Sequence, residues 1–344
     1  MTTSIFLSSL AVVIAFLFFW AFRHLPSEEW QMIASVPTRR TEGGEWLGLN
    51  LTYYGFFNAT ACAFACAYVL LLMATLGVSW YLSFGIVAGG MLIALPAARF
   101  IARLIEGKRH TFTVAGASFV LMLLLPWLLS LLNLIGDPTL HVPARPALAA
   151  ITIGYAFGES IGRLACISFG CCYGKLLVEK HTTLRKFSFV FSGATKKAAY
   201  ESKLDGVCLI PIQAVTSIIY AGAGLAGSLL FLEAHWTAAL IVTLTITQIW
   251  RIISEFFRAD FRGGRLISAY QIMALAGLVY SIIILSLLPD DWAQAPDLTN
   301  GLRVFTDAWS LILLQMIWFA VFLYLGRSSV TGSILRFHVK ADRI

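Results

Sequence analysis

The chain has 344 residues, of which 59% are hydrophobic and only 12% are charged, against roughly 25% charged residues in a typical soluble domain. Its mean hydropathy is +0.80, and its formal net charge is +7. These values exclude an ordinary soluble domain, so we expect a membrane-embedded protein without nucleic acid among its partners.

Nine apolar runs are long enough to cross a membrane as helices. The hydrocarbon core is roughly 30 Å thick, and a helix needs about 20 residues to span it. Backbone groups cannot stay unpaired in lipid, so these runs must be helical. The sequence therefore predicts an all-α integral membrane protein, a polytopic helical bundle with one sizeable insert outside the membrane. The runs lie near 4–23, 51–77, 80–104, 112–135, 147–168, 209–232, 236–257, 267–288 and 305–326.

The run at 4–23 shares its length and apolar character with secretory signal peptides. It has no basic residue before the apolar stretch, however, and no small-x-small cleavage site in the "FRHLPSEEW" that follows it. We expect it to remain as a transmembrane helix.

Lysine and arginine crowd one side of the predicted bundle. If the runs cross the membrane alternately, all but two of the 25 Lys and Arg residues fall on the face that carries 104–111, 169–208 and the C-terminal tail. The two exceptions are Arg145 and Arg303. The positive-inside rule makes the crowded face cytoplasmic.

Two predicted helix ends on this face carry charged residues, which are costly in a membrane and usually face a cavity. Arg163 lies in "GESIGRLACISFG", with Glu159 one helical turn earlier. Arg251 and Glu255, four residues apart in "TQIWRIISEFFRAD", share a helix face on which an ion pair would orient both side chains. Arg258 follows, and for this residue snorkelling to lipid headgroups is an equal alternative.

Arg163 and Arg251 are the strongest candidates for binding a ligand. Two guanidinium groups that meet at one membrane face suit a phosphate, because their planar donors match phosphate oxygens two at a time. We therefore predict that the ligand is an anionic phospholipid headgroup.

The stretch "GRLACISFGCCYGK" at 162–175 ends the fifth run and combines three glycines with three cysteines. Glycine adopts positive φ and lets the backbone approach a ligand closely. Gly162, Gly170 and Gly174 therefore predict a tight turn whose amides line the site. A plain helix stop is the alternative.

The insert at 175–208 carries seven Lys or Arg residues. Within it, Phe187, Phe189 and Phe191 alternate with other residues, which predicts a short strand. We expect either a basic, apolar flap that gates the site or a segment that rests on the bilayer surface.

Several motifs resemble those of the prolipoprotein diacylglyceryl transferases in order and spacing. They are "LTYYGF", "GRLACISFGCCYGK", "FSFVFSG", "GVCLIPIQAV", "RIISEFFRAD" and "ISAYQIMAL". That family of the bacterial inner membrane moves the diacylglyceryl group of phosphatidylglycerol onto the sulfur of a lipobox cysteine and releases glycerol phosphate. The resemblance implies a seven-helix core at 51–290 with a head insert at 170–208. It leaves 1–50 as an extra helix with a polar loop, and 291–344 as an extra helix with a basic tail.

The resemblance also assigns roles to individual residues. Arg163 and Arg251 would hold the phosphate and support catalysis, and Glu255 would orient Arg251. Substrate-binding positions matched to the family's signature, its second block, its His-Pro-x-Gln turn and its first helix are Gly162, Gly170, Gly174, Arg258, Gln213 and Tyr54.

The chain departs from the family at positions that would activate the acceptor. Cys166 replaces the signature asparagine at a substrate-binding position, and Cys171 replaces its glutamate. Thr52 and Ile210 stand where the family has histidines. The family's His-Gly-Gly, which contains a residue often proposed as the base, has become Val-Ala-Gly at 114–116, and His110 nearby is an open candidate to replace that base.

The cysteines allow two further interpretations. Because Arg163 would lower the pKa of a nearby thiol, Cys171 or Cys172 is a candidate catalytic nucleophile that carries an acyl or diacylglyceryl intermediate. The other interpretation is a metal site, whose ligands would be Cys166, Cys171, Cys172 and Cys208. Their spacing does not resemble that of zinc ligand pairs. We therefore expect no metal and no cofactor.

The resemblance implies a phospholipid-dependent transferase that uses phosphatidylglycerol or a similar anionic lipid as the donor of a diacylglyceryl or phosphoglycerol group. Its acceptor would be a glycan, a small molecule or a preprotein. The alternatives are a non-catalytic lipid-binding or scaffolding membrane protein, and a prolipoprotein diacylglyceryl transferase proper. In the family the site faces the periplasm, whereas the charge count places it in the cytosol, and anionic-lipid binding would itself recruit basic residues.

Overall fold

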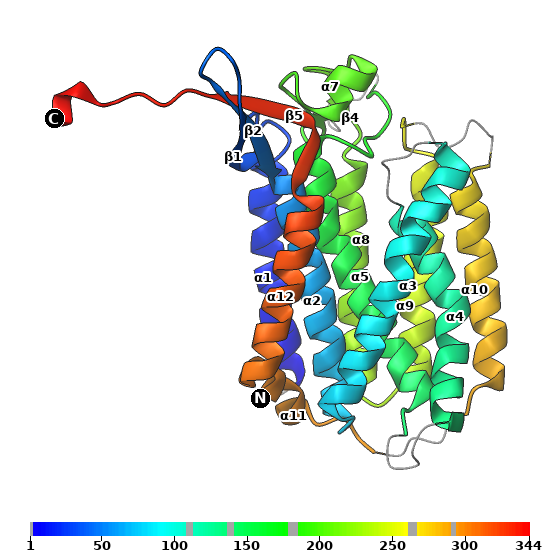
Figure 1. Ribbon diagram of the computed structural model, residues 1–344. Helices are drawn as coiled ribbons and strands as arrows, with labels where there is room; N and C mark the ends of the chain where they lie inside the picture. The colour runs from blue at the N-terminus through cyan, green and yellow to red at the C-terminus, as the bar shows by residue number, and fades with distance from the viewer. Residues whose placement is uncertain (1–2, 108–112, 136–140, 178–184, 261–266, 290–293) are drawn as a thin grey trace.

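The computed structural model describes residues 3–107, 113–135, 141–177, 185–260, 267–289 and 294–344, and it is mainly helical. Nine long helices within these ranges run along a common direction and form the body of the molecule (Figure 1). They are α1 (Thr3–His24), α2 (Tyr53–Thr75), α3 (Trp80–Glu106), α4 (Val114–Ile135), α5 (Ala144–Phe169), α8 (Ile212–Leu232), α9 (Trp236–Glu255), α10 (Ala269–Leu287) and α12 (Ala308–Leu325).

Eight of these helices are long and apolar enough to cross a membrane. The expected multi-pass helical membrane protein is therefore confirmed in outline. The fifth predicted span, which is α5, is not among the eight, and it carries Arg145, Glu159 and Arg163 within its 26 residues. The count of nine spans stays a prediction.

Helix α5 lies at the centre of the bundle and packs against α2, α8, α9 and α4. Its contact with α2 is close because small residues face one another. A Cβ at Gly158 would meet the Cβ of Ala65 at 3.0 Å, and a Cβ at Gly154 would meet the side chain of Val69 at 2.5 Å. Small residues that let two backbones approach are typical of helix interfaces in membranes. This packing fixes the helix that carries the candidate site.

A three-stranded antiparallel sheet, which the sequence analysis does not predict, joins the two ends of the chain. It is built from β1 (Met32–Arg40), β2 (Trp46–Thr52) and β5 (Arg327–Leu335), in the order β1-β2-β5. Trp46 pairs with Leu335, and Leu51 pairs with Arg327. The polar loop and the basic tail, expected as separate additions to a core at 51–290, are thus hydrogen-bonded to each other; the domain boundaries themselves stay a prediction.

The head insert lies at the same end of the bundle as this sheet, opposite the N-terminus (Figure 1). It contains α7 (Lys197–Ser202) and a two-stranded pairing of β3 (Phe189–Val190) with β4 (Cys208–Leu209). The strand predicted from the phenylalanine alternation is therefore confirmed, although it is short. Phe189 and Phe191 are buried, whereas Phe187 is 71% exposed.

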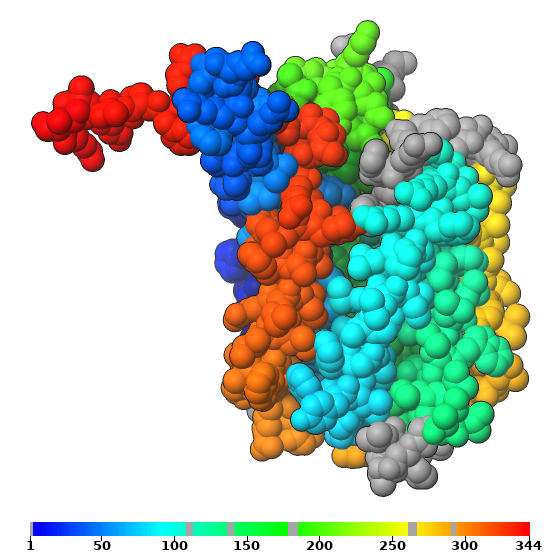
Figure 2. Space-filling model, viewed as in Figure 1, coloured from blue at the N-terminus to red at the C-terminus, as the bar shows by residue number. Residues whose placement is uncertain are grey.

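The remaining described elements are short. They are α11 (Leu298–Leu302), η2 (Arg303–Phe305) and η3 (Ala341–Arg343). The last of these ends a tail that projects away from the body beyond β5 (Figure 2). The sheet, the insert and this tail share one end of the molecule, as the alternation of the apolar runs predicts.

The junction between α2 and the end of α12 gives a first testable prediction. A Cβ at Gly55 would overlap the Cα of Gly326, where the Thr52 amide also donates to the Gly326 carbonyl at 2.9 Å. We expect Gly55→Ala to push these backbones apart and to lower the free energy of unfolding by about 1–3 kcal/mol. Thermal unfolding in detergent measures the change.

Gly85 on α3 provides the matched control, since a Cβ there meets nothing within 4 Å. Gly85→Ala should leave the melting temperature equal or slightly higher, because alanine favours the helix more than glycine does. Equal melting of both variants would contradict the close approach.

Candidate functional site

One face of α5 carries a cluster of buried charges. Tyr155, Glu159 and Arg163 follow one another at four-residue spacing, which places them in line along the helix. Arg163 donates a hydrogen bond to the Glu159 carboxylate. From α9, a guanidinium nitrogen of Arg251 lies 3.8 Å from the other oxygen of the same carboxylate. The two arginines that the sequence analysis selects therefore share one carboxylate.

This cluster is shielded from solvent. The side chains of Glu159 and Arg251 are only 4% and 7% exposed, and that of Arg163 is 17% exposed. The Nε of Arg163 is buried without a hydrogen-bond partner in the described part of the chain. Buried polar groups are normally paired, so this guanidinium keeps a donor for a further acceptor.

Glu159 and Tyr155 are site residues that the sequence analysis does not select. Arg251 donates a hydrogen bond to the Tyr155 hydroxyl. The sequence signal for both was their spacing: Glu159 lies four residues and Tyr155 eight residues before Arg163, so all three side chains share one face of α5. The partnership with Arg251 depends on how α9 packs on α5, which the spacing does not reveal.

Below the cluster, a partly open cavity of about 70 Å³ lies between α4, α5, α9 and α10. Leucine, isoleucine and methionine side chains dominate its lining, and Tyr155 and Gln248 contribute polar groups. The side-chain amide nitrogen of Gln248 is buried and has no hydrogen-bond partner within the described ranges. Because Tyr155 both lines the cavity and accepts a hydrogen bond from Arg251, the apolar space and the arginine cluster adjoin each other at this side chain.

Arg258, beyond the end of α9, is held by two carboxylates. Its Nε and a terminal nitrogen each donate to Asp260 at 2.9 Å, which is a bidentate pair. Another nitrogen lies 3.7 Å from the Glu255 carboxylate. Glu255 is thus paired with Arg258, and its expected role in orienting Arg251 stays a prediction.

A tight turn after α5 holds the predicted glycines. Gly170 ends the helix with φ +69°, the left-handed conformation that favours glycine. A Cβ at Gly174 would overlap the carbonyl of Ile210, so the close approach of these two segments requires glycine at this position. At Gly162 an added Cβ would make only an ordinary contact with Ala61, at 3.7 Å. Two of the three glycines therefore have a structural reason.

The turn is anchored to two other segments. The amide of Lys175 donates to the Phe257 carbonyl at 2.8 Å, and the amide of Ala259 donates to the Tyr173 carbonyl at 3.1 Å. Gln213, at the start of α8, donates from its side chain to the Cys171 carbonyl at 2.9 Å. The predicted site residues of the turn, of α8 and of the segment after α9 are therefore brought together.

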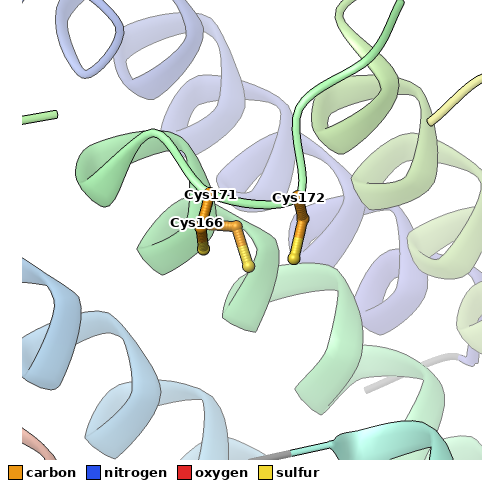
Figure 3. A group of neighbouring side chains, drawn as sticks. All are labelled: Cys166, Cys171 and Cys172. Atoms are coloured by element: carbon orange, nitrogen blue, oxygen red, sulfur yellow. The ribbon is translucent and has the colours of Figure 1, made fainter. Parts of the chain in front are cut away.

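Three cysteines gather beneath this turn. The sulfur atoms of Cys166, Cys171 and Cys172 all lie within 4.8 Å of one another (Figure 3). Tyr54 lies close enough to interact electrostatically with all three thiols, and its ring packs edge-on against Phe169. Cys208, the fourth ligand considered in the sequence analysis, is outside this group and interacts with Ser188 and Arg185 of the insert.

The surroundings of Cys171 do not favour the nucleophile hypothesis. Hydrogen bonding with the neighbouring thiols of Cys166 and Cys172, together with burial, raises the pKa of Cys171 well above its ordinary value. The hypothesis required a pKa lowered by Arg163. The direction of this shift is opposite to the one that the hypothesis requires, and the catalytic role of Cys171 stays a prediction. His110, the open candidate for a base, lies outside the described residues.

Lys196 fixes the head insert over the end of α5. Its side chain is fully buried, and its ammonium group donates to the carbonyls of Leu25 and Ser168 at 2.8 and 2.7 Å. Its stem packs against Gly170. Burial lowers the pKa of Lys196 to about 8. One lysine thus connects α1, α5 and the insert beside the thiol turn.

No family model matches this chain, and no curated protein matches it. The relation to the prolipoprotein diacylglyceryl transferases remains a resemblance carried by the motifs of the sequence.

The shared carboxylate gives a prediction about stability. Glu159→Gln removes the negative charge between Arg163 and Arg251 and leaves two buried cations without it. Breaking a buried ion pair from one side costs about 3–5 kcal/mol, so we expect a clearly lower melting temperature in detergent. Glu233→Gln, at an exposed carboxylate after α8, is the matched control and should melt like the unchanged protein. Unaltered melting of Glu159→Gln would show that the shared carboxylate does not hold the cluster together.

The buried lysine gives a prediction about pH. Because the pKa of Lys196 is lower in the folded protein than in the unfolded chain, the unfolded chain binds more protons between about pH 8 and its ordinary pKa of 10.5. The contribution of Lys196 to stability therefore rises with pH across this window. The melting temperature of the unchanged protein minus that of Lys196→Met should increase from pH 8 to pH 10.5. A difference that is flat with pH would contradict the lowered pKa.

Proposed function

We propose that this protein is a phospholipid-dependent membrane transferase, which takes phosphatidylglycerol or a similar anionic lipid as the donor of a diacylglyceryl or phosphoglycerol group. The observation that carries the proposal is that the arginine cluster and the apolar cavity adjoin each other at Tyr155. A charged head above an apolar space matches an anionic amphiphile. Neither a free anion nor an uncharged lipid would use both parts.

The arginine cluster supports binding of the phosphate. Arg163 keeps a buried Nε donor without a partner within the described residues, and Arg251 approaches the same carboxylate from α9. A phosphate oxygen entering beside Glu159 would accept hydrogen bonds from planar guanidinium groups. The cavity next to Gln248 would then take the acyl chains.

The same arginines would support catalysis through charge. In diacylglyceryl transfer the bond between the glycerol carbon and the phosphate oxygen breaks, and its electron pair stays on the oxygen of the departing glycerol phosphate. The acceptor atom bonds to the carbon and loses its proton. Fixed cations beside the departing oxygen stabilise the charge that develops there, an effect worth about 3–4 kcal/mol per donor in other enzymes.

The acceptor is expected to differ from a lipobox cysteine. Thr52 and Ile210, which stand in place of two family histidines, have structural partners. Thr52 caps α2 and donates to the Gly326 carbonyl at 3.1 Å, and Ile210 packs against Gly174. Neither is a base. Because the family's two histidines are absent, the acceptor need not be a lipobox cysteine, and a glycan or a small molecule is proposed in its place.

A non-catalytic lipid-binding protein is the second candidate. It is favoured by Glu159, whose carboxylate already neutralises part of the charge of Arg163 and Arg251, and by the replaced histidines. Such a protein would keep the lipid site and lack the reaction.

Mass spectrometry of lipids and lipid-linked glycans separates the two. Cells carrying the intact chain should contain a species that falls at least about 100-fold with Arg163→Ala, the loss typical of a removed transition-state donor. Arg343→Ala, at an exposed arginine of the tail, is the matched control and should keep the species. The mass of the species that depends on Arg163 would identify the acceptor.

Identical lipid and glycan profiles, with all three proteins folded at equal levels, would contradict the transferase. Binding of the purified protein to phosphatidylglycerol vesicles, weakened by Arg163→Ala, would then support the lipid-binding protein.

A further inference from the structure

The three thiols at the end of α5 form a closed triangle. Every pair of sulfur atoms among Cys166, Cys171 and Cys172 lies within 4.8 Å. Cys166 comes from the last turn of the helix, and the other two come from the turn after it. Figure 3 shows the three side chains directed to the same region below the turn. Cys171 is only 9% exposed.

The backbone that presents these thiols is held in place. Adjacent residues of an extended chain point to opposite sides, yet Cys171 and Cys172 both contribute to the triangle. Cys172 has φ +57°, a left-handed conformation that is uncommon outside glycine. Gln213 holds the Cys171 carbonyl. A strained residue kept by its surroundings indicates a functional constraint at the turn.

Cations surround the triangle. Arg163 interacts electrostatically with Cys166 and Cys172, and Arg258 interacts with Cys172. Lys197 interacts with Cys171 and Cys172, and all three cations are oriented by carboxylate partners. Positive charge beside the triangle would offset the negative charge of thiolates bound to a metal ion.

We propose that Cys166, Cys171 and Cys172 bind one soft metal ion, Cu(I), as three thiolates. Binding converts three thiols to thiolates and releases three protons, so the complex carries a charge of −2. Arg163, Arg258 and Lys197 surround that charge. The site lies beside the proposed lipid site but does not depend on the proposed function.

The choice of ion follows from the donors. Soft thiolate ligands select Cu(I) and Zn²⁺ among the common metals, whereas Mg²⁺ and Ca²⁺ prefer oxygen. A structural zinc site needs four ligands, and the described residues bring three such donors together. Three sulfurs at bonds of about 2.3 Å in a trigonal plane would lie about 4.0 Å apart. Rotation of the side chains that moves each sulfur by less than about 1 Å would bring the three sulfurs to this separation.

In the sequence, the spacing of the cysteines differs from that of zinc ligand pairs, and this difference argued against a metal site. The structure excludes Cys208 from the group and gathers the other three. The difference arises from the left-handed residues Gly170 and Cys172, which fold the chain back on the helix end.

Titration of the purified full-length protein with Cu(I), under anaerobic conditions and against a chromophoric Cu(I) chelator, tests the proposal. We expect one Cu(I) per chain, a thiolate-to-copper charge-transfer band in the ultraviolet, and three protons released per ion. Single Cys→Ser changes at positions 166, 171 and 172 should each weaken binding at least about 100-fold, since even partners outside the ligand set contribute 10–100-fold. Cys208→Ser and Cys62→Ser are the matched controls and should bind like the unchanged protein.

Thermal unfolding of each variant shows that it is folded before titration. The proposal is overturned if the folded variants bind Cu(I) as the unchanged protein does, or if Zn²⁺ binds as tightly as Cu(I). It is also overturned if thiol titration of the anaerobic protein detects only one of the three thiols until a reductant is added. That result would mean that two of the three cysteines form a disulfide and that only the third is a free thiol.

Discussion

The structure depends on the carboxylate of Glu159, which holds a guanidinium from its own helix and approaches one from α9. Charges of this kind are costly in lipid, so the helix that carries them cannot face the membrane. The bundle meets this constraint by surrounding α5 with α2, α8, α9 and α4. The central position of α5 shields these charges from lipid, and its small residues against α2 allow the close packing that this position needs.

The two ends of the chain hold the peripheral helices on the bundle. Lipid is as apolar as the side chains of these helices, so burial of apolar surface does not keep them in place. Without a hydrophobic driving force between helices, packing and hydrogen bonds must do this. The sheet supplies hydrogen bonds outside the membrane, since β2 leads directly into α2 and β5 follows α12. Lys196 gives the head insert a comparable attachment to α1 and α5. Both attachments lie at the end of the molecule that holds the candidate site.

Local pattern accounts for the part of this structure that the sequence predicts. Apolar runs give the helices, and four-residue spacing places Arg163 on one face of α5. The remainder depends on contacts between distant segments. The partners Trp46 and Leu335 are nearly 300 residues apart, and no local pattern pairs them. Glu159 is visible as a neighbour of Arg163, but its second arginine becomes apparent only when α9 packs on α5. The thiol triangle depends on the backbone of Cys172, whose φ +57° no sequence rule assigns to cysteine.

The order of groups along α5 relates these features to one another. Tyr155 lines the apolar cavity, Glu159 and Arg163 follow one and two turns later, and Cys166 begins the thiol triangle. A single helix face therefore passes from apolar to charged to thiol chemistry towards the end of the molecule that carries the insert. Arg163 is paired with the Glu159 carboxylate and interacts electrostatically with Cys166 and Cys172, so one guanidinium group lies between the charged cluster and the thiols.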